Sequence, residues 1–330
     1  MKWNSQSKRW GLAAAILAIA ISLPDKDAHA QTYPSKPIRV IVPVGIGGPP
    51  DIAGRMLAQK VSESLGQPMV IENRVGAGGT IGGQVVVKSA PDGYTLLMGS
   101  GSSLVIGPTL FPAAAYSPTK SFSPISLVSH QPFVFAVPTI LKTDTLREFI
   151  ALVKANPAKY NYASSLTGSP PNMMGEWFKR KTGLDLVHIP FGGSAKAVTA
   201  MAAGDAQLYI EVAPVFLSQV QAGRIKILAT ASAKRSPFLT DVPTTGEAGL
   251  PDFEIGSWNA LVGPLGMPAE IVTRLNAEVR KAISTKELQE GFARAFFEIQ
   301  LSSPEELGRF MAGELEKWGR LINETGIKAN

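Results

Sequence analysis

Short apolar runs rich in β-branched residues alternate with amphipathic segments along most of the chain. Runs with a period of two residues predict strands, and patterns with a period of 3.6 residues predict helices. The predicted strands are 38–44, 69–72, 94–98, 160–163, 186–189, 207–210 and 226–229, and the predicted helices are 51–65, 84–89, 146–155, 172–181 and 195–203. Strands that alternate with helices in this way are typical of an α/β fold with parallel strands.

Two segments interrupt the alternation. Residues 119–138 hold turn residues followed by a long apolar run without a helix, and residues 257–266 are again extended. We interpret both as strands that cross between two α/β lobes. Three helices predicted within 268–324 then return to the first lobe, the last of them opened by a capping box at Ser303 and Glu306. This assigns residues 31–127 and 257–330 to lobe 1 and residues 128–256 to lobe 2.

The first 30 residues have the order of a secretory signal peptide. Basic Lys2, Lys8 and Arg9 precede the apolar run 11–23, and Ala28 and Ala30 form an A-x-A cleavage pair. The apolar run is shorter than the roughly 20 residues that span a bilayer. We expect export to the periplasm with cleavage after Ala30; a retained N-terminal anchor is the alternative.

Composition and charge narrow the functional classes. Removal of residues 1–30 leaves 28 basic and 24 acidic side chains, a formal charge of +4, without an arginine-rich tract. This mild basicity argues against nucleic acid and suits a small acidic ligand. The chain has no Cys, which excludes disulfides and thiolate chemistry. Only His130 and His188 would remain, neither at metal-ligand spacing, so we expect no metal and no cofactor. His188 is expected to be a hydrogen-bonded strand residue.

Four loops between a strand and a helix are rich in glycine or proline. They are VPVGIGGPPD (42–51), NRVGAGGTIGG (73–83), ASSLTGSPPN (163–172) and PFGGSAKAV (190–198). Such loops lie at the carboxyl edge of parallel strands, where amides at helix starts bind anions. The dinucleotide fingerprint and the Walker lysine are absent, so a carboxylate fits better than a triphosphate. For one loop, relief of turn strain is the simpler explanation; four at equivalent places favour a binding site. Asp51 is expected to cap its helix, with contact to a bound water or a ligand ammonium as the alternative.

The strongest pattern for an enzyme is the S-x-x-K motif formed by Ser117 and Lys120, followed by Lys-Thr-Gly at 181–183, as in serine acylases that recognise penicillin. Pro118 disfavours a helix at Ser117, and Gly183 is placed as a helix end. Glu314 and Glu316 form a carboxylate pair that we interpret as solvated helix surface. The residues therefore favour a binding protein.

Several longer motifs occur in order between residue 33 and about residue 280. They are YPSKPIRVIVPV, GIGGPPDIAGRMLAQ, NRVGAGGTIGG, SAPDGYTLLMG, NPAKYNYASS, LVHIPFGG and AKRSPFLTDVPTTGEAGLP. The chain resembles the Bug family of periplasmic solute receptors of tripartite tricarboxylate transporters. The resemblance implies a two-lobed, type II periplasmic binding protein (Venus flytrap) that closes on an organic carboxylate and passes it to the membrane subunits of a transporter, acting as a monomer; an orphan receptor used for sensing is the alternative.

The resemblance also implies the ligand-binding residues. From lobe 1 they are Ile46, Gly47, Gly48, Asp51, Gly78, Gly79, Thr80, Ser100, Ser102 and Ser103; from lobe 2 they are Ser165, Thr167, Ser169, Asn172, Phe191, Gly192, Gly193, Ser194 and Glu211.

This chain departs from the family pattern at several of these places. It has Ile46 before the paired glycines, Leu104 after the third strand, Pro171 and Asn172 where Ser-His is common, and Phe191 and Glu211 where Tyr and Asp are usual. We hypothesise a ligand less polar than citrate or glutamate, such as an aromatic or alkyl mono- or dicarboxylate. The alternative is that Ile46 and Leu104 pack under their loops and carry no information on specificity.

Overall fold

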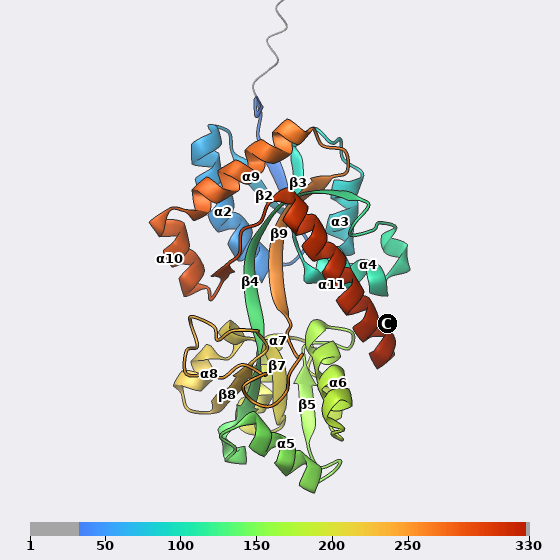
Figure 1. Ribbon diagram of the computed structural model, residues 1–330, viewed down its shortest axis with the longest axis vertical. Helices are drawn as coiled ribbons and strands as arrows, with labels where there is room; N and C mark the ends of the chain where they lie inside the picture. The colour runs from blue at the N-terminus through green and yellow to red at the C-terminus, as the bar shows by residue number, and fades with distance from the viewer. Residues whose placement is uncertain (1–32, 328–330) are drawn as a thin grey trace, which may run out of the picture. The chain divides into compact units, whose positions relative to one another are not determined.

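The computed structural model describes residues 33–327 (Figure 1). The chain divides into two units, residues 1–35 and 36–330. Of the first unit only residues 33–35 are described, and the Tyr33–Pro34 peptide bond is cis. The predicted signal peptide, residues 1–30, lies outside the described residues. All further elements belong to the second unit.

One part of the sheet carries the strands predicted for lobe 1, in the order β2-β1-β3-β9-β4. These strands are β1 (Ile38–Val42), β2 (Met69–Asn73), β3 (Thr95–Ser100), β4 (Phe122–Pro138) and β9 (Gly256–Pro264). β1 is parallel to β2 and β3, whereas β9 is antiparallel to β3 and β4, and the short β10 (Glu298–Ile299) pairs with β4. The carboxyl ends of β1, β2 and β3 therefore lie at one edge.

The other part of the sheet continues from the same long strand, β4. Its strands are β5 (Asn161–Ser164), β6 (Val187–Pro190), β7 (Leu208–Val212) and β8 (Ile225–Thr230). β7 and β8 pair antiparallel with β4, and β5 lies parallel between β6 and β7. Along β4 the partner changes from Gly256 at Pro132 to Val212 at Phe133. β4 is thus the strand that joins the two parts, as the uninterrupted apolar run predicts; the lobe boundaries themselves stay a prediction.

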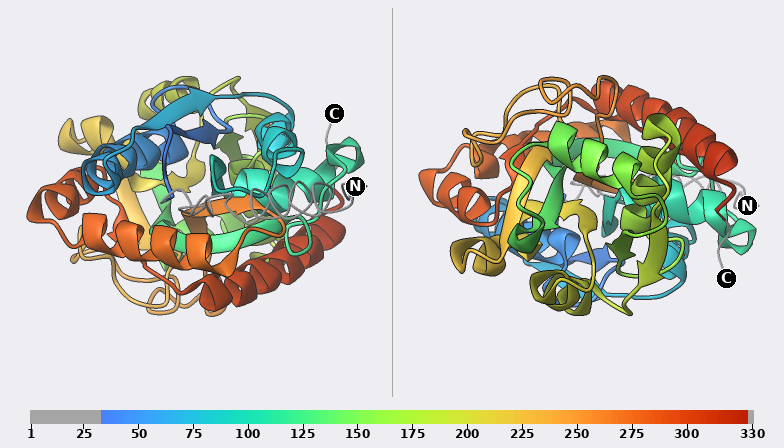
Figure 2. Two further views of the ribbon diagram at one scale, coloured as in Figure 1. Left: turned by 90° about the horizontal axis from the view of Figure 1, so that it is seen from above. Right: turned by 90° about the horizontal axis from the view of Figure 1, so that it is seen from below.

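Helices cover both faces of these strands, as the end-on views show (Figure 2). The α-helices are α2 (Pro49–Leu65), α3 (Thr80–Val87), α4 (Gly107–Leu110), α5 (Leu146–Ala155), α6 (Pro170–Thr182), α7 (Ser194–Ala203), α8 (Leu217–Gln221), α9 (Ala269–Ile283), α10 (Lys286–Arg294) and α11 (Pro304–Thr325). Short 3-10 turns are η1 (Ala77–Gly79), η3 (Pro112–Ala114), η4 (Thr139–Leu141) and η5 (Ala213–Val215), and η2 (Ser102–Ile106) is a π turn. In Figure 1, α2 and α9 lie on one side of β3 and β9, and α3 and α11 lie on the other.

Each predicted strand and helix is present, with boundaries that differ by four residues at most. The largest difference is at α3, which begins at Thr80 because Gly82 and Gly83 are helical rather than part of the loop. A Cβ atom on Gly82 would lie 2.9 Å from the Cβ of Pro43, and one on Gly83 would lie 2.5 Å from the hydroxyl of Tyr116. The glycines thus serve close packing of the helix.

A continuous apolar core links the two parts of the sheet. Ile41, Leu97 and Val262 belong to the same buried cluster as Phe135 and Phe253, whose rings lie 5.2 Å apart. A smaller cluster lies under α7 and contains the buried Tyr209 of β7. Burial of this much apolar surface is the dominant favourable contribution to folding in a chain without disulfides.

The capping box predicted for α11 is confirmed. Ser303 Oγ accepts the amide of Glu306 at 3.1 Å, and the Glu306 carboxylate accepts the amide of Ser303 at 2.7 Å. The prediction that Glu314 is solvated surface is wrong: its exposed fraction is 6%. Glu314 lies on the buried face of α11, where its Oε2 accepts the indole N–H groups of Trp258 (2.9 Å) and Trp318 (3.0 Å). These charge-assisted bonds compensate for burial of the carboxylate.

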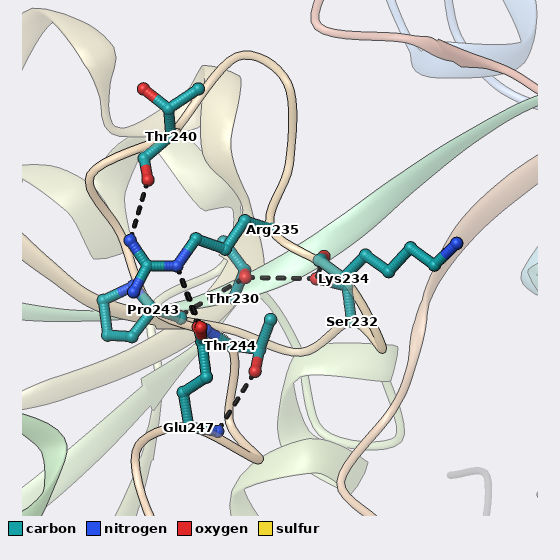
Figure 3. A network of polar contacts seen from close by, with 8 residues as sticks. All are labelled: Thr230, Ser232, Lys234, Arg235, Thr240, Pro243, Thr244 and Glu247. Atoms are coloured by element: carbon teal, nitrogen blue, oxygen red, sulfur yellow. Dashed lines mark hydrogen bonds and ion pairs between the residues drawn. The ribbon is translucent and has the colours of Figure 1, made fainter.

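The long connection between β8 and β9, residues 231–255, is held by a polar network (Figure 3). Arg235 donates to both carboxylate oxygens of Glu247 at 3.1 and 2.9 Å and to the carbonyl of Thr240 at 3.0 Å. Thr244 and Glu247 exchange bonds of 2.7 and 3.1 Å in the manner of a capping box. The segment is therefore ordered without regular secondary structure.

Candidate functional site

The turn after β1 is fixed by the side chain of Asp51. Its Oδ2 accepts the amide of Gly47 at 3.0 Å, and its Oδ1 accepts Asn73 Nδ2 at 2.8 Å; Arg55 pairs with the same carboxylate. Asp51 is 2% exposed. Burial raises the pKa of Asp51, but the bonds from Arg55, Asn73 and Gly47 outweigh burial and lower the pKa overall, so the carboxylate is ionised at neutral pH.

The prediction that Asp51 caps α2 is wrong. Gly48 is the capping residue, and the helix begins at Pro49, so Asp51 is the third helical residue. Proline is favoured at the first helical position because it lacks the N–H that would stay unpaired there, and the Pro49–Pro50 pair moves the start forward. Asp51 instead accepts an amide from the turn that precedes the helix.

The turns after β2 and β3 meet through Gly79 and Ser103. Gly79 has a φ of +91°, and a Cβ atom there would lie 2.7 Å from the Cβ of Ser103. The hydroxyl of Ser103 bonds the amide of Ser100 at 3.0 Å, and the hydroxyl of Thr80 donates to the carbonyl of Ala77 at 2.9 Å. These buried hydroxyls shape the turns, and Gly78 is exposed beside them.

In the other part of the sheet, the turn after β5 repeats the bond seen after β1. The amide of Gly168 donates to Asn172 Oδ1 at 2.9 Å, and Asn172 Nδ2 donates to the hydroxyl of Tyr162 at 2.7 Å. Asn172 is 3% exposed and, like Asp51, is the third residue of a helix that opens with two prolines. This correspondence was not predicted from the sequence, where the short pattern G-x-P-P-[DN] is its only trace.

The turn after β6 is joined to the turn after β5 through its backbone. The amide of Phe191 donates to the carbonyl of Ser164 at 3.0 Å, and the amide of Gly193 donates to the carbonyl of Ser165 at 2.9 Å. Gly192 and Gly193 have φ values of +75° and +144°, which favour glycine. α7 then begins at Ser194, so its first amides lie beside the turn.

The remaining predicted residues lie on the same turns. Ser169 donates through its hydroxyl to the carbonyl of Leu166 at 2.6 Å. Thr167 is exposed, whereas Ser102 and Gly48 are partly buried.

Glu211 stands at the end of β7, close to the start of α7. Its Oε1 accepts the amide of Val212 at 3.0 Å, and its Oε2 lies 3.4 Å from the hydroxyl of Tyr209, which in turn lies 3.1 Å from Ser194 Oγ. Burial raises the pKa of Glu211 to about 7, although the bonds from Val212, Tyr209 and Ser194 oppose the shift. Tyr209 was missed by the sequence analysis; its position two residues before Glu211 in a strand places both on one face.

His188 is a hydrogen-bonded strand residue, as predicted. Its Nε2 lies 2.7 Å from Ser164 Oγ, its ring stacks on Tyr162 at 4.9 Å, and burial lowers its pKa. Within residues 33–327, no group of three or more His, Asp or Glu side chains could hold a metal ion. Over the same range, no helix is both long and apolar enough to span a membrane.

A cavity of about 520 Å³ lies apart from these turns, behind β4 and β9. It is lined in part by His130, Glu298 and Glu314, and none of the predicted ligand-binding residues lines it. Burial raises the pKa of Glu298, but bonds from His130 and Ser236 outweigh it and lower the pKa overall. Ser117, the candidate nucleophile of the S-x-x-K motif, lies before a turn at 118–120, and its Oγ lies 3.4 Å from Thr119 Oγ1.

Comparison with known proteins identifies the family to which the chain belongs. Residues 53–327 match the family model described as the tripartite tricarboxylate transporter family receptor. The chain is 37% identical over 300 residues to Protein BugT of Bordetella pertussis, covering 91% of this chain and 92% of BugT. It also superimposes on the solved structure of the periplasmic binding protein BugD with a TM-score of 0.76 and 30% identity, over 90% of this chain and 100% of that one.

Two other solved structures contain dicarboxylates. Rpa4515 of Rhodopseudomonas palustris with adipate has a TM-score of 0.79 and 30% identity, over 90% of this chain and 99% of that one. MatC of the same species with bound malate has a TM-score of 0.74 and 30% identity, over 88% of this chain and 100% of that one.

Proposed function

Since the chain belongs to the tripartite tricarboxylate transporter receptor family, we propose that it is an extracytoplasmic receptor that binds one small organic carboxylate between its two lobes and delivers it to a membrane transporter. The observation that carries this proposal is the matched pair of turns at Gly47 and Gly168. Each lies at the carboxyl end of a parallel strand, the place where α/β proteins bind ligands. The neighbouring helices α3 and α7 begin without proline, so their first turns keep amide donors for an anion.

The comparisons support the class of ligand. Adipate and malate in the two related structures are both dicarboxylates, and neither is a nucleotide. Among the four turn segments, Arg74 is paired with Glu72 and Lys196 is an exposed residue of α7, so we propose that recognition relies mainly on amides and hydroxyls. Such donors suit carboxylates better than triphosphates.

Exposed apolar side chains beside the turns support a ligand with an apolar part. Ile46, in the turn after β1, is 83% exposed, and Leu166, in the turn after β5, is 58% exposed. Leu104, in contrast, is fully buried against Gly99, so packing explains its presence. Ile46 does not pack under its loop. An alkyl or aromatic mono- or dicarboxylate would bury Ile46 and Leu166 when it binds.

Capture would follow from a hinge on β4, the strand shared between the two parts, and on the chain that enters β9 at Gly256. A ligand that contacts the turns of both lobes favours the closed state because it binds that state better. The transporter then recognises the closed form. We further propose that the protein is exported by its signal peptide, cleaved after Ala30, and acts as a monomer in the periplasm; a receptor used for sensing would use the same site.

We also propose that the protein is not an enzyme. The hydroxyl of Ser117 contacts Thr119 instead of the ammonium of Lys120, which removes the activation that a serine acylase needs. His188 contacts one hydroxyl, that of Ser164 at 2.7 Å, but Ser164 is fully buried, so its hydroxyl is closed to a substrate.

The test is a thermal-shift screen of residues 31–330 against dicarboxylates, tricarboxylates, aromatic carboxylates, amino acids and nucleotides, followed by calorimetry. A ligand that binds only the folded state raises the melting temperature by mass action. Stabilisation by carboxylates at one site per chain, without turnover, supports the proposal. Stabilisation by a nucleotide and by no carboxylate would contradict it, as would turnover that is lost in Ser117→Ala.

A further inference from the structure

A carboxylate side chain, that of Glu211, lies beside the first residue of α7. Glu211 is held at Oε1 by the amide of Val212, and the hydroxyls of Tyr209 and Ser194 also contact the carboxylate. Ser194 is the first residue of α7 and follows the turn at Gly192 and Gly193. A carboxylate ligand at this turn would therefore approach a second carboxylate.

The groups that face Glu211 are neutral. From β7 they are the Tyr209 hydroxyl and the Val212 amide, from α7 the Ser194 hydroxyl, and on β4 the residue opposite in register is Val134. Ser165, in the turn after β5, reaches Glu211 only through Tyr209. The cation nearest in sequence on α7, Lys196, is exposed and forms no ion pair with Glu211, so no cation compensates the charge of Glu211 across these elements. Burial without a cation raises its pKa to about 7, within reach of proton uptake near neutral pH.

We propose that Glu211 binds the ligand as a neutral acid, so that capture of one carboxylate is coupled to the uptake of one proton. This inference rests on the proposed receptor function and adds a specificity residue to it. The ionised Glu211 takes one proton from solvent, and its new O–H donates a hydrogen bond to an ionised oxygen of the ligand. The site thereby gains a donor and loses one negative charge, and a repulsive pair becomes an attractive one.

The coupling fixes the direction of the pH dependence. Ordinary carboxylic acids stay largely ionised between pH 6 and pH 8, so only the protein titrates in this range. If the bound ligand keeps Glu211 protonated throughout, the dissociation constant rises about tenfold from pH 6 to pH 8. A ligand that presents an ammonium group to Glu211 needs the ionised form and gives the opposite slope.

The experiment is calorimetric titration of the full mature chain with adipate and with malate at pH 6, 7 and 8, in buffers of different ionisation enthalpy. We expect affinity to fall about tenfold over this range and proton uptake to approach one per ligand at pH 8. An equal dissociation constant at pH 6 and pH 8 without proton uptake would overturn the role of Glu211. Failure of adipate, malate and every carboxylate of the thermal-shift panel to bind at any of these pH values would instead overturn the receptor proposal.

Two variants separate a specific role from a structural one. Glu211→Gln keeps a neutral donor in place, so we expect its affinity at pH 8 to match that of the wild type at pH 6, without proton uptake. The control is Glu176→Gln, since Glu176 also accepts from a buried tyrosine hydroxyl, that of Tyr162 at 2.5 Å, but lies on α6 outside the turns. We expect Glu176→Gln to keep the wild-type pH dependence. If Glu211→Gln does not fold, the proton count of the wild type decides alone.

Discussion

The amide of Gly168 donates to Asn172 Oδ1 at 2.9 Å, and the amide of Gly47 donates to Asp51 Oδ2 at 3.0 Å. In both turns the acceptor is the third residue of a helix that opens with two prolines. Both acceptors are buried and fix the turn that precedes the helix; because the two prolines have no N–H, these helix starts offer a ligand fewer amides than those of α3 and α7. The same hydrogen bond, from a glycine amide to the third residue of the following helix, thus occurs in both proposed halves of the binding site.

Removal of either acceptor should destabilise the fold. Asp51→Ala removes the acceptor of the Gly47 amide and one partner each of Asn73 and Arg55, and we expect a loss of about 1–3 kcal/mol in the free energy of unfolding. Asn172→Ala should cost a similar amount. Urea denaturation measures both, with Asp185→Ala as control because Asp185 is exposed. An Asp51→Ala variant as stable as this control would contradict the assigned role.

The contribution of Asp51 should depend on pH. Its pKa is lowered in the folded state, so its stabilising effect is present above the unfolded value of 3.8 and is lost as pH falls through the folded value. We expect the difference in unfolding free energy between wild type and Asp51→Ala to be full at pH 7 and to shrink below pH 3.8. A difference that stays constant down to pH 2 would show that the charge of Asp51 is irrelevant.

Replacement of the two turn glycines should separate folding from binding. In Gly79→Val the new Cβ would lie 2.7 Å from the Cβ of Ser103, so we expect a marked fall in melting temperature. In Gly193→Val no atom lies within 4 Å of the new Cβ, so we expect a smaller fall together with loss of carboxylate binding. Gly313→Ala, at an open position in α11, is the control and should gain up to about 1 kcal/mol. Full ligand affinity in Gly193→Val would place the ligand elsewhere.

Glu211 should reduce stability at high pH. Its folded pKa is raised to about 7 from 4.5, so stability is greatest below 4.5 and is lost as pH rises through about 7. Without ligand, Glu211→Gln should therefore melt at a higher temperature than the wild type at pH 8 and at nearly the same temperature at pH 4.5. Differential scanning fluorimetry at the two pH values measures both melting temperatures. An equal difference between variant and wild type at pH 4.5 and pH 8 would contradict a raised pKa of Glu211.

Loss of Glu314 should lower stability and change the environment of Trp258 and Trp318. Glu314→Ala removes the acceptor of the Trp258 and Trp318 indoles, and a buried unpaired donor costs about 1–3 kcal/mol. We expect a lower urea midpoint and a change in tryptophan emission. Glu316→Ala is the matched control, since Glu316 lies two residues further along α11 and is exposed. Equal effects of the two substitutions would refute the assigned packing.

Local patterns were enough to predict most of the fold. The period of the apolar residues and the glycine stops gave α5 with its exact bounds and placed β4 and β9 as uninterrupted strands. Errors arose where a distant contact decides the local structure. Gly82 and Gly83 belong to α3 because Pro43 and Tyr116 pack against them, and Glu314 is buried because Trp258, 56 residues away, donates to it.

In the candidate site, too, local features were predictable from the sequence and those set by distant contacts were not. The glycine turns are visible in the sequence because only glycine favours their backbone angles, as at Gly79 and Gly193. The partners that hold the turns are not visible, because strand pairing brings them together: Asn73 reaches Asp51 only when β2 lies beside β1. The raised pKa of Glu211 likewise depends on burial that no local pattern encodes.

A crystal structure of the mature chain grown with adipate tests the central claim most directly. We predict one adipate per chain, with a carboxylate oxygen within hydrogen-bonding distance of amides in the turns of both parts of the sheet, those preceding α2 or α3 and those preceding α6 or α7. Adipate held instead in the cavity beside His130 and Glu298, or by the turns of one part alone, would contradict the account.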